Sequence, residues 1–421
     1  MAREGAVTPA VARSVDAVWR IEGSKIVATL ARVTGDLGLA EDLAQDAVAE
    51  ALASWAGSGV PRNPAAWLTA VAKRRAIDGW RRRELRDDRY RALARDLDAT
   101  TEDEWEPIPD DVLRLVFAAC HPALSREAQV ALTLRVVASL TTEEIARMFL
   151  VPVATIQQRI VRAKKTLAAA RVPFEVPDPA DWPARLGAVL GVVYLVYTEG
   201  YSATSGERWV RSELAAEALR LGRVLAALLP REPEVHALVA LMEFQSSRFR
   251  AREALDGSPV LLGDQDRSRW DRAQIARGIA ALDRADGVGR GRGSYALQAA
   301  IARCHAVAPS VETTDWDEIV VLYEALGRLA PNPVVELNRA VAVSMATGPA
   351  NALRIVDALA ADGALRGSHL VPSVRGELLA RLGRLDEARA ELTAAAQLAA
   401  NDRERDVLLG KAAALAARRL E

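Results

Sequence analysis

Residues 140–167 read LTTEEIARMFLVPVATIQQRIVRAKKTL, and this sequence predicts two helices separated by a tight turn. Thr141 and Glu144 have the spacing of a capping box, which predicts a short helix over residues 142–149. Pro152 ends that helix, and a second helix begins directly after it. Two helices joined by a turn of three or four residues, the second with a basic end, are the outline of a helix-turn-helix.

The second helix, from about Val153, separates into an apolar face and a polar face. At about 100° per residue, one stripe collects apolar residues that we expect to pack inward. These are Ile156, Ile160, Ala163 and Leu167. The opposite side presents groups that can hydrogen-bond base edges or neutralise phosphates. They are Thr155, Gln157, Gln158, Arg159, Arg162 and Lys165. An ordinary solvated helix face is the alternative interpretation, and the capped preceding helix and the tight turn count against it.

A second basic segment lies upstream. Residues 73–91, KRRAIDGWRRRELRDDRYR, hold nine basic side chains, although the formal net charge of the whole chain is only −1. A charge run is usually a solvated helix surface. Here Trp67 and Trp80 lie on the same predicted helix, which starts near Pro64, and aromatic rings beside cations suit unpaired bases. We therefore interpret the segment as a surface for nucleic acid, part of it single-stranded.

Two more helices are predicted ahead of this segment, at about residues 9–33 and 37–56. In the second, apolar residues recur at spacings of three and four, which is typical of an amphipathic helix. We expect its other side to carry the polar residues Glu41, Asp42, Gln45, Asp46 and Glu50.

Charge and proline divide the chain of 421 residues into parts. Residues 96–111 carry eight carboxylates and no basic residue, which indicates an acidic linker. Residues 172–183 contain four prolines and indicate a second linker. The division thus predicts units at 1–95, 112–171 and 184–421, all of them helical, in an all-α protein.

The last unit contains an internal repeat. Residues 374–402 have small and large apolar residues at tetratricopeptide positions, namely Gly376, Leu379, Gly383, Ala388, Leu392 and Ala395. Gly348 lies 35 residues before Gly383, close to the 34-residue period of that repeat. We expect a short helical solenoid whose concave groove suits a peptide or another domain.

Composition limits the class of protein. No stretch approaches the roughly 20 apolar residues that cross a bilayer, and the first residues lack the apolar core of a signal peptide, so we expect a cytoplasmic protein. Cys120 and Cys304 lie far apart, which argues against a disulfide framework. With two cysteines and four histidines in all, we expect no metal and no cofactor, and we expect Cys120, His121 and His305 to be structural.

The order of these motifs resembles bacterial RNA polymerase sigma factors of the sigma-70 family, in the extracytoplasmic-function class. GLAEDLAQDAVAEALASW (38–55) resembles region 2.2, and NPAAWLTAVAKRRAIDGWRRR (63–83) resembles regions 2.3 and 2.4. Residues 140–167 resemble the helix-turn-helix of region 4. YLVYTEGYSATSGE and LLGDQDRSRWDRAQIA are similar to segments of a subgroup that has a fused tetratricopeptide-like C-terminal domain.

The resemblance implies roles for matching positions. Asp42, Gln45 and Asp46 would dock on the coiled coil of the polymerase β′ subunit, and the β flap is the second implied contact on the core enzyme. The set that would capture the melted minus-ten element is Asn63, Trp67, Lys73, Arg74, Asp78, Trp80, Arg81 and Arg82. The minus-thirty-five element would be read as duplex DNA by the polar residues of the helix from Val153, which are Thr155, Gln157, Gln158, Arg159, Arg162 and Lys165. The chain would then direct polymerase to promoters without being an enzyme, and its C-terminal domain would regulate it.

Two other interpretations stay open at this point. The solenoid could be primary, as a peptide-binding scaffold with a generic DNA tether, or residues 184–310 could hold a small-molecule sensor or an enzyme. GVGRGRG (287–293) superficially suggests a phosphate-cradling loop, but no predicted strand precedes it and the Lys-Ser/Thr of a P-loop is missing. The acids and arginines of QDRSRWD (265–271) suit a catalytic site, yet helix caps need the same residues.

Overall fold

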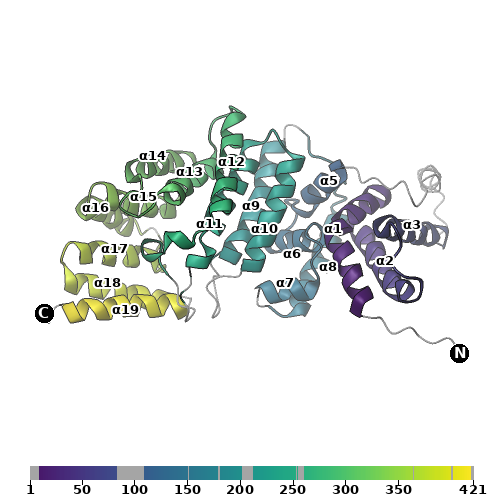
Figure 1. The fold of residues 1–421 in the computed structure, drawn as a ribbon, viewed down its shortest axis with the longest axis horizontal. Coiled ribbons are helices and arrows are strands. Elements are labelled where there is room, and N and C mark those ends of the chain that lie inside the picture. The colour runs from purple at the N-terminus through teal and green to yellow at the C-terminus, as the bar shows by residue number, and fades with distance from the viewer. Residues whose placement is uncertain are drawn as a thin grey trace. The chain divides into compact units, whose positions relative to one another are not determined.

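The computed structural model describes residues 9–82, 109–149, 151–178, 181–201, 212–252, 254, 260–363, 365–399 and 402–418 (Figure 1). All the regular elements within these ranges are α-helices or short 3-10 helices, so the all-α prediction is confirmed. The chain divides into two compact units, which we call the N-terminal unit (Met1–Val193) and the C-terminal unit (Tyr194–Glu421). The predicted domain boundaries stay predictions, since most of the acidic linker lies outside the described residues.

The N-terminal unit begins with a bundle of three helices. These are α1 (Pro9–Thr34), α2 (Leu37–Ser58) and α3 (Pro64–Arg82), close to the predicted ranges. α1 packs against both others, and the fully buried Ile26, Leu30, Trp55 and Leu68 form its core. Side-chain caps explain two of the starts, because Asp36 accepts a hydrogen bond from the Leu39 amide (3.1 Å) and Asn63 accepts one from the Ala66 amide (3.1 Å).

The same unit continues with the predicted helix-turn-helix. Its helices are α5 (Pro109–Ala119), α6 (Arg126–Val136), α7 (Thr142–Phe149) and α8 (Val153–Ala169). The capping box is confirmed, since the Thr141 amide donates to Glu144 (2.9 Å) and the Glu144 amide donates to the Thr141 hydroxyl (3.1 Å). The local sequence therefore sets where α7 starts.

Helix α9 (Trp182–Tyr201) contains the boundary between the two units. Its first turns belong to the N-terminal unit, where the Trp182 ring lies 5.1 Å from the Phe117 ring. The Arg185 guanidinium also donates to the Phe117 carbonyl (3.0 Å). The start of α9 is thus anchored on the end of α5.

The C-terminal unit is a succession of helices after α9. They are α10 (Ser212–Leu228), α11 (Pro233–Ser246), α12 (Arg272–Gly287), α13 (Ser294–Val307), α14 (Trp316–Leu329), α15 (Pro333–Ala346), α16 (Pro349–Ala361), α17 (Leu370–Arg381), α18 (Leu385–Leu398) and α19 (Asp402–Arg418). Short 3-10 helices η1 (Phe249–Ala251), η2 (Leu262–Asp264) and η3 (Arg267–Arg269) lie between α11 and α12. From α13 onward each helix packs against the next along the chain (Figure 1).

The repeat signals lie where turns and close packing need them. Gly348 (φ 102°) directly precedes α16, and Gly383 (φ 77°) lies in the turn before α18. A Cβ on Gly376 would lie 2.8 Å from Cγ of Leu392, so only glycine lets α17 approach α18 this closely. α15 to α19 share one apolar core, and the tetratricopeptide type of this stack stays a prediction.

Of the helices described, none is long and apolar enough to span a bilayer.

Candidate functional site

The polar face predicted on α8 is available to a ligand. Ile156, Ile160, Ala163 and Leu167 are buried as expected. On the other side Gln157, Gln158, Arg162 and Lys165 are exposed, while Thr155 and Arg159 are half-buried. The helix therefore presents a row of amide, guanidinium and ammonium groups that can reach base edges and phosphates.

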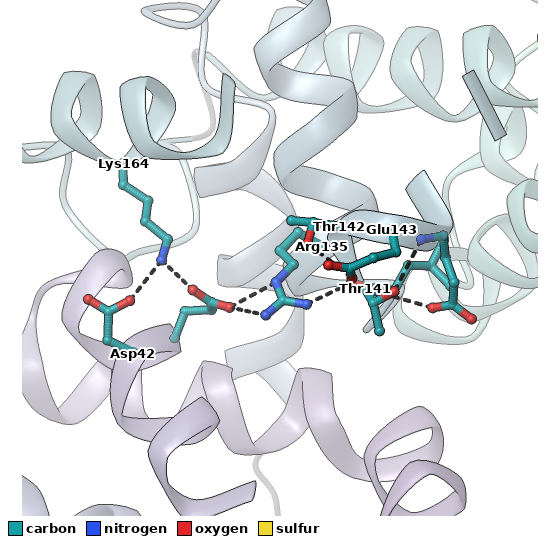
Figure 2. A network of polar contacts seen from close by, with 9 residues as sticks. Asp42, Arg135, Thr141, Thr142, Glu143 and Lys164 are labelled. Carbon is teal, nitrogen blue, oxygen red and sulfur yellow. Dashed lines mark hydrogen bonds and ion pairs between the residues drawn. The ribbon is translucent and has the colours of Figure 1, made fainter. Parts of the chain in front are cut away.

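A lysine with no role in the sequence analysis ties α8 to α2. The Lys164 Nζ donates to Asp42 (3.0 Å) and to Glu41, and Figure 2 shows Lys164 reaching down to Asp42. Lys164 is half-buried, and the directly following Lys165 is exposed. These two neighbouring lysines of α8 therefore differ in role, because Lys164 binds α2 and Lys165 is exposed to solvent.

Glu41 is the centre of this network. Its side chain accepts from Arg135 of α6 (Figure 2) through Nε (2.9 Å) and Nη2 (2.8 Å). Arg135 also donates to the Leu140 carbonyl (3.0 Å). Glu41 is only 5% exposed, although the sequence pattern places it on the polar side of α2. Arg135 and Lys164, which lie on other helices, compensate the charge of the buried carboxylate. The sequence pattern of α2 alone does not predict these two partners.

The three residues expected to dock on polymerase have different environments. Asp42 is bound by Lys164 on one side but its side chain is 73% exposed. Asp46 is exposed and pairs with Arg75 of α3 (3.3 Å). Gln45 is half-buried, and its Nε2 has no hydrogen-bond partner within the described part of the chain. The polar side of α2 is therefore partly engaged by α3 and α8.

The predicted minus-ten residues lie on or beside α3. Asn63 caps the helix, and Trp67 is half-buried with its ring 5.4 Å from the Trp55 ring in an edge-on arrangement. Lys73 is half-buried, and its burial and then the nearby Arg32 lower its pKa.

Two more of these residues, Arg74 and Asp78, are exposed. The side chains of Trp80, Arg81 and Arg82 and the rest of the basic segment lie outside the described residues. The described part of α3 thus offers cations and one aromatic ring, while the predicted role of Trp80 stays a prediction.

Two further ion pairs join the first helices to the helix-turn-helix. Arg20 of α1 pairs with Glu144, the capping residue of α7. Arg32 of α1 pairs with Asp111 of α5 (2.9 Å), which is buried and also accepts from Arg114 (2.8 Å). Together with Lys164 and Arg135, these pairs connect α1 and α2 to every helix from α5 to α8.

Cys120 and His121, at the end of α5, have structural contacts. The Cys120 thiol is buried within 3.4 Å of the Thr133 hydroxyl, and burial raises its pKa to about 11. His121 Nδ1 accepts from the Ala123 amide (3.1 Å). No cluster of three or more His, Cys, Asp or Glu side chains is placed to hold a metal ion among the residues described.

The two segments of the C-terminal unit that suggested catalysis lie at the starts of helices, and carboxylates cap those starts. Glu234 accepts from the amides of Tyr295 (2.8 Å) and Ala296 (3.1 Å), so a carboxylate already occupies the start of α13, next to the 287–293 loop. Asp266 and Asp271 cap η3 and α12. The contacts therefore favour the loop and cap interpretations over a phosphate cradle.

Comparison with known proteins gives three family matches. Residues 20–86 match the family model described as Sigma-70 region 2, and residues 114–167 match Sigma-70, region 4. Residues 185–286 match a family of unknown function, DUF6596. The first two matches cover α2, α3 and the helix-turn-helix, which carry the candidate residues.

Two relatives extend the comparison. An uncharacterised protein of Rhizobium meliloti (strain 1021) is 46% identical over 387 residues, which are 89% of this chain and 89% of that protein. The probable ECF RNA polymerase sigma factor SigI of Mycobacterium tuberculosis is 26% identical over 172 residues, 40% of this chain and 58% of the relative. No solved structure matches the chain.

Proposed function

Since the chain belongs to the extracytoplasmic-function sigma factors of the sigma-70 family, we propose that it directs core RNA polymerase to a particular set of promoters in the bacterial cytoplasm. The observation that carries the proposal is the presence of a region 2 match and a region 4 match in one chain, each over helices with exposed basic side chains such as Arg74 and Arg162. The β′ coiled coil would bind the polar side of α2, and the β flap would bind the region 4 part.

The two surfaces would divide the promoter between them. α8 would read the minus-thirty-five element as duplex, because an exposed row of Gln158, Arg162 and Lys165 fits the donor and acceptor pattern of the major groove. α3 would hold the minus-ten element as a single strand, which Trp67 and the cations around it can stack on and neutralise. Strand opening would draw on this binding free energy and on core polymerase, with no reaction catalysed by the chain.

The network between α2 and α8 suggests how the free protein is held. Asp42, a proposed contact for polymerase, is bound by Lys164 of the DNA-reading helix. Polymerase and Lys164 would therefore compete for the same carboxylate. We propose that the free chain is a closed form and that the α2–α8 network opens when core polymerase binds.

The C-terminal unit would control this activity. It is a compact unit of its own, and α9, in which the boundary lies, is anchored on α5 through Arg185. A shortened chain ending at Val193 keeps that anchor, whereas a chain ending at Pro183 loses it. We expect promoter-dependent transcription by the chain ending at Val193 to differ at least ten-fold from that of the full chain, and equal activity would contradict control.

The proposal is tested by transcription in vitro with purified bacterial core polymerase and the full chain on a library of genomic fragments. We expect transcripts that start at a defined set of sites sharing an upstream and a downstream element. The matched control is Arg162→Ala, which should reduce transcript yield by weakening the upstream contact while the start sites stay the same. Duplex DNA binding with no transcripts and no association with core polymerase would contradict the proposal and favour a scaffold.

A further inference from the structure

The C-terminal unit contains a cavity of about 580 Å³ that the promoter-binding surfaces do not use. Residues from α9, α11, α13, α14 and α15 line it, together with Leu262 of η2. Its volume lies within the range of small-molecule sites, which is roughly 300–1,000 Å³. Walls from several helices suit a compact molecule better than an extended peptide.

The cavity combines apolar walls with polar groups that point to a ligand. Phe244, Ile301 and Leu326 supply apolar surface, and the two phenols come from Tyr194 and Tyr323. Burial raises the pKa of Tyr194, and it raises that of Tyr323 to about 12. Both phenols are therefore neutral near pH 7 and can donate hydrogen bonds to a ligand.

Two buried polar atoms of the lining have no hydrogen-bond partner among the described residues. They are Oε1 of Gln245 and Nδ1 of His305. An unpaired buried polar atom costs free energy, so such atoms call for a partner that the described residues do not supply. The carboxamides of Gln298 and Asn338 lie on the same walls.

The charge on the described lining of the cavity is positive. Among the described residues that line the cavity, Arg248 is the one charged side chain and none is a carboxylate. Arg248 donates to the Tyr201 hydroxyl and lies 5.8 Å from the centres of the Tyr201 and Trp270 rings. A half-buried guanidinium without a carboxylate on these walls attracts an anion.

A second arginine, behind the wall of the cavity, adds to the positive electrostatic potential in the cavity. Arg267 is 7% exposed, and it donates to the carbonyls of His305 (2.9 Å) and Ala308 (2.7 Å) and to the Thr314 hydroxyl (3.3 Å). Burial, followed by Arg248 and Arg267, lowers the pKa of His305 to about 4, so the imidazole is neutral near pH 7. The exposed Glu312 interacts electrostatically with Arg267.

We propose that this cavity binds a small aromatic carboxylic acid, with its carboxylate on Arg248 and its ring against Phe244, Tyr194 and Tyr323. A single lining cation suits a monoanion better than a phosphate ester, which carries more charge. The aromatic walls favour a planar ring, and the carboxamides give hydrogen bonds to its substituents. The inference is independent of the sigma-factor role, because binding can be measured without polymerase or DNA.

Calorimetric titration of the full chain with 1-naphthoate tests the proposal, and the neutral 1-naphthamide of nearly the same shape is the matched probe. We expect one site per chain for the acid and at least about ten-fold weaker binding of the amide, since a hydrogen bond to a charged group is lost. Equal affinity for the two probes, or no saturable binding of 1-naphthoate, would overturn the proposal.

Two variants and a control locate the site. Arg248→Gln should weaken 1-naphthoate binding at least about ten-fold, whereas Arg250→Gln, whose side chain is exposed and does not line this cavity, should not change it. Ala302→Phe fills the cavity from α13 without removing a polar group, so it should abolish binding even if Arg248→Gln fails to fold. Binding that survives Ala302→Phe in a folded chain would place the ligand elsewhere and overturn the assignment. Binding of a peptide with a free C-terminus in preference to 1-naphthoate would overturn it too.

Discussion

At the scale of single residues, Glu41 shows how a charge becomes part of a core. Its carboxylate is buried, and Arg135 and Lys164 reach it from α6 and α8. A buried pair of this kind contributes little net stability compared with apolar packing, but removing one partner leaves an uncompensated charge. Glu41 therefore specifies how α2 meets the helix-turn-helix.

Glu41→Ala should destabilise the N-terminal unit by about 3 kcal/mol, because Arg135 and Lys164 lose their shared carboxylate in a partly buried place. Glu50→Ala is the matched control on the same helix, and its half-exposed pair with Arg75 (2.7 Å) should be worth less than about 1 kcal/mol. Hydrogen exchange of α2 and α8 peptides measures both effects. Equal protection in the two variants would contradict the role given to Glu41.

At the scale of elements, local signals account for most of the helices. α7 and α8 begin where the sequence predicts, because the signals for them lie within a few residues of one another. These signals are the capping box, Pro152 and the apolar stripe of α8. Contacts between helices far apart in sequence were not predictable in this way. Lys164 and Lys165 are neighbours with the same chemistry, and only tertiary packing makes one of them a partner of α2.

The candidate functional residues also divide into those that the local sequence predicts and those that depend on packing between helices. Those on α8 were predictable, because one helical period separates buried from exposed positions. The engagement of Asp42 and Asp46 by Lys164 and Arg75 depends on where α3 and α8 pack on α2. The cavity of the C-terminal unit could not be predicted from the sequence either, since the residues that line it come from helices up to about 140 residues apart.

The turn glycines of the C-terminal stack give a prediction about elements. Gly383→Ala should destabilise the C-terminal unit by about 1 kcal/mol or more, because the turn before α18 needs a positive φ (77°). Gly327→Ala is the control with the opposite sign, since it lies within α14 with open space around it and should stabilise by about 0.5–1 kcal/mol. Urea unfolding of the two variants compares them. A neutral Gly383→Ala would contradict the assigned turn.

At the scale of the whole molecule, the ion pairs that join α1 and α2 to the helices from α5 to α8 suggest a protein that is closed when alone. On the proposed function, polymerase binding would have to displace Lys164 from Asp42, and the fraction of open chains would set the apparent affinity for core enzyme. Under this proposal the closed form would be a barrier to polymerase binding, and a partner or a ligand of the C-terminal unit would lower or raise it.

Lys164→Ala should bind core polymerase roughly ten-fold more tightly than the unaltered chain, because the closed form loses one of its links. Lys165→Ala should leave that affinity unchanged and instead weaken duplex promoter binding with a smaller salt dependence, as expected for a phosphate contact. Fluorescence anisotropy with labelled protein measures both affinities. Identical behaviour of the two lysine variants would exclude the competition between α8 and polymerase.

The most direct measurement is size-exclusion chromatography of the purified full chain with bacterial core polymerase, followed by quantification of both proteins in the shared peak. The account predicts co-elution at one chain per core enzyme, and it predicts that Asp46→Arg, on the exposed side of α2, reduces the amount bound. A chain that elutes separately from core polymerase at every concentration tested would contradict the account.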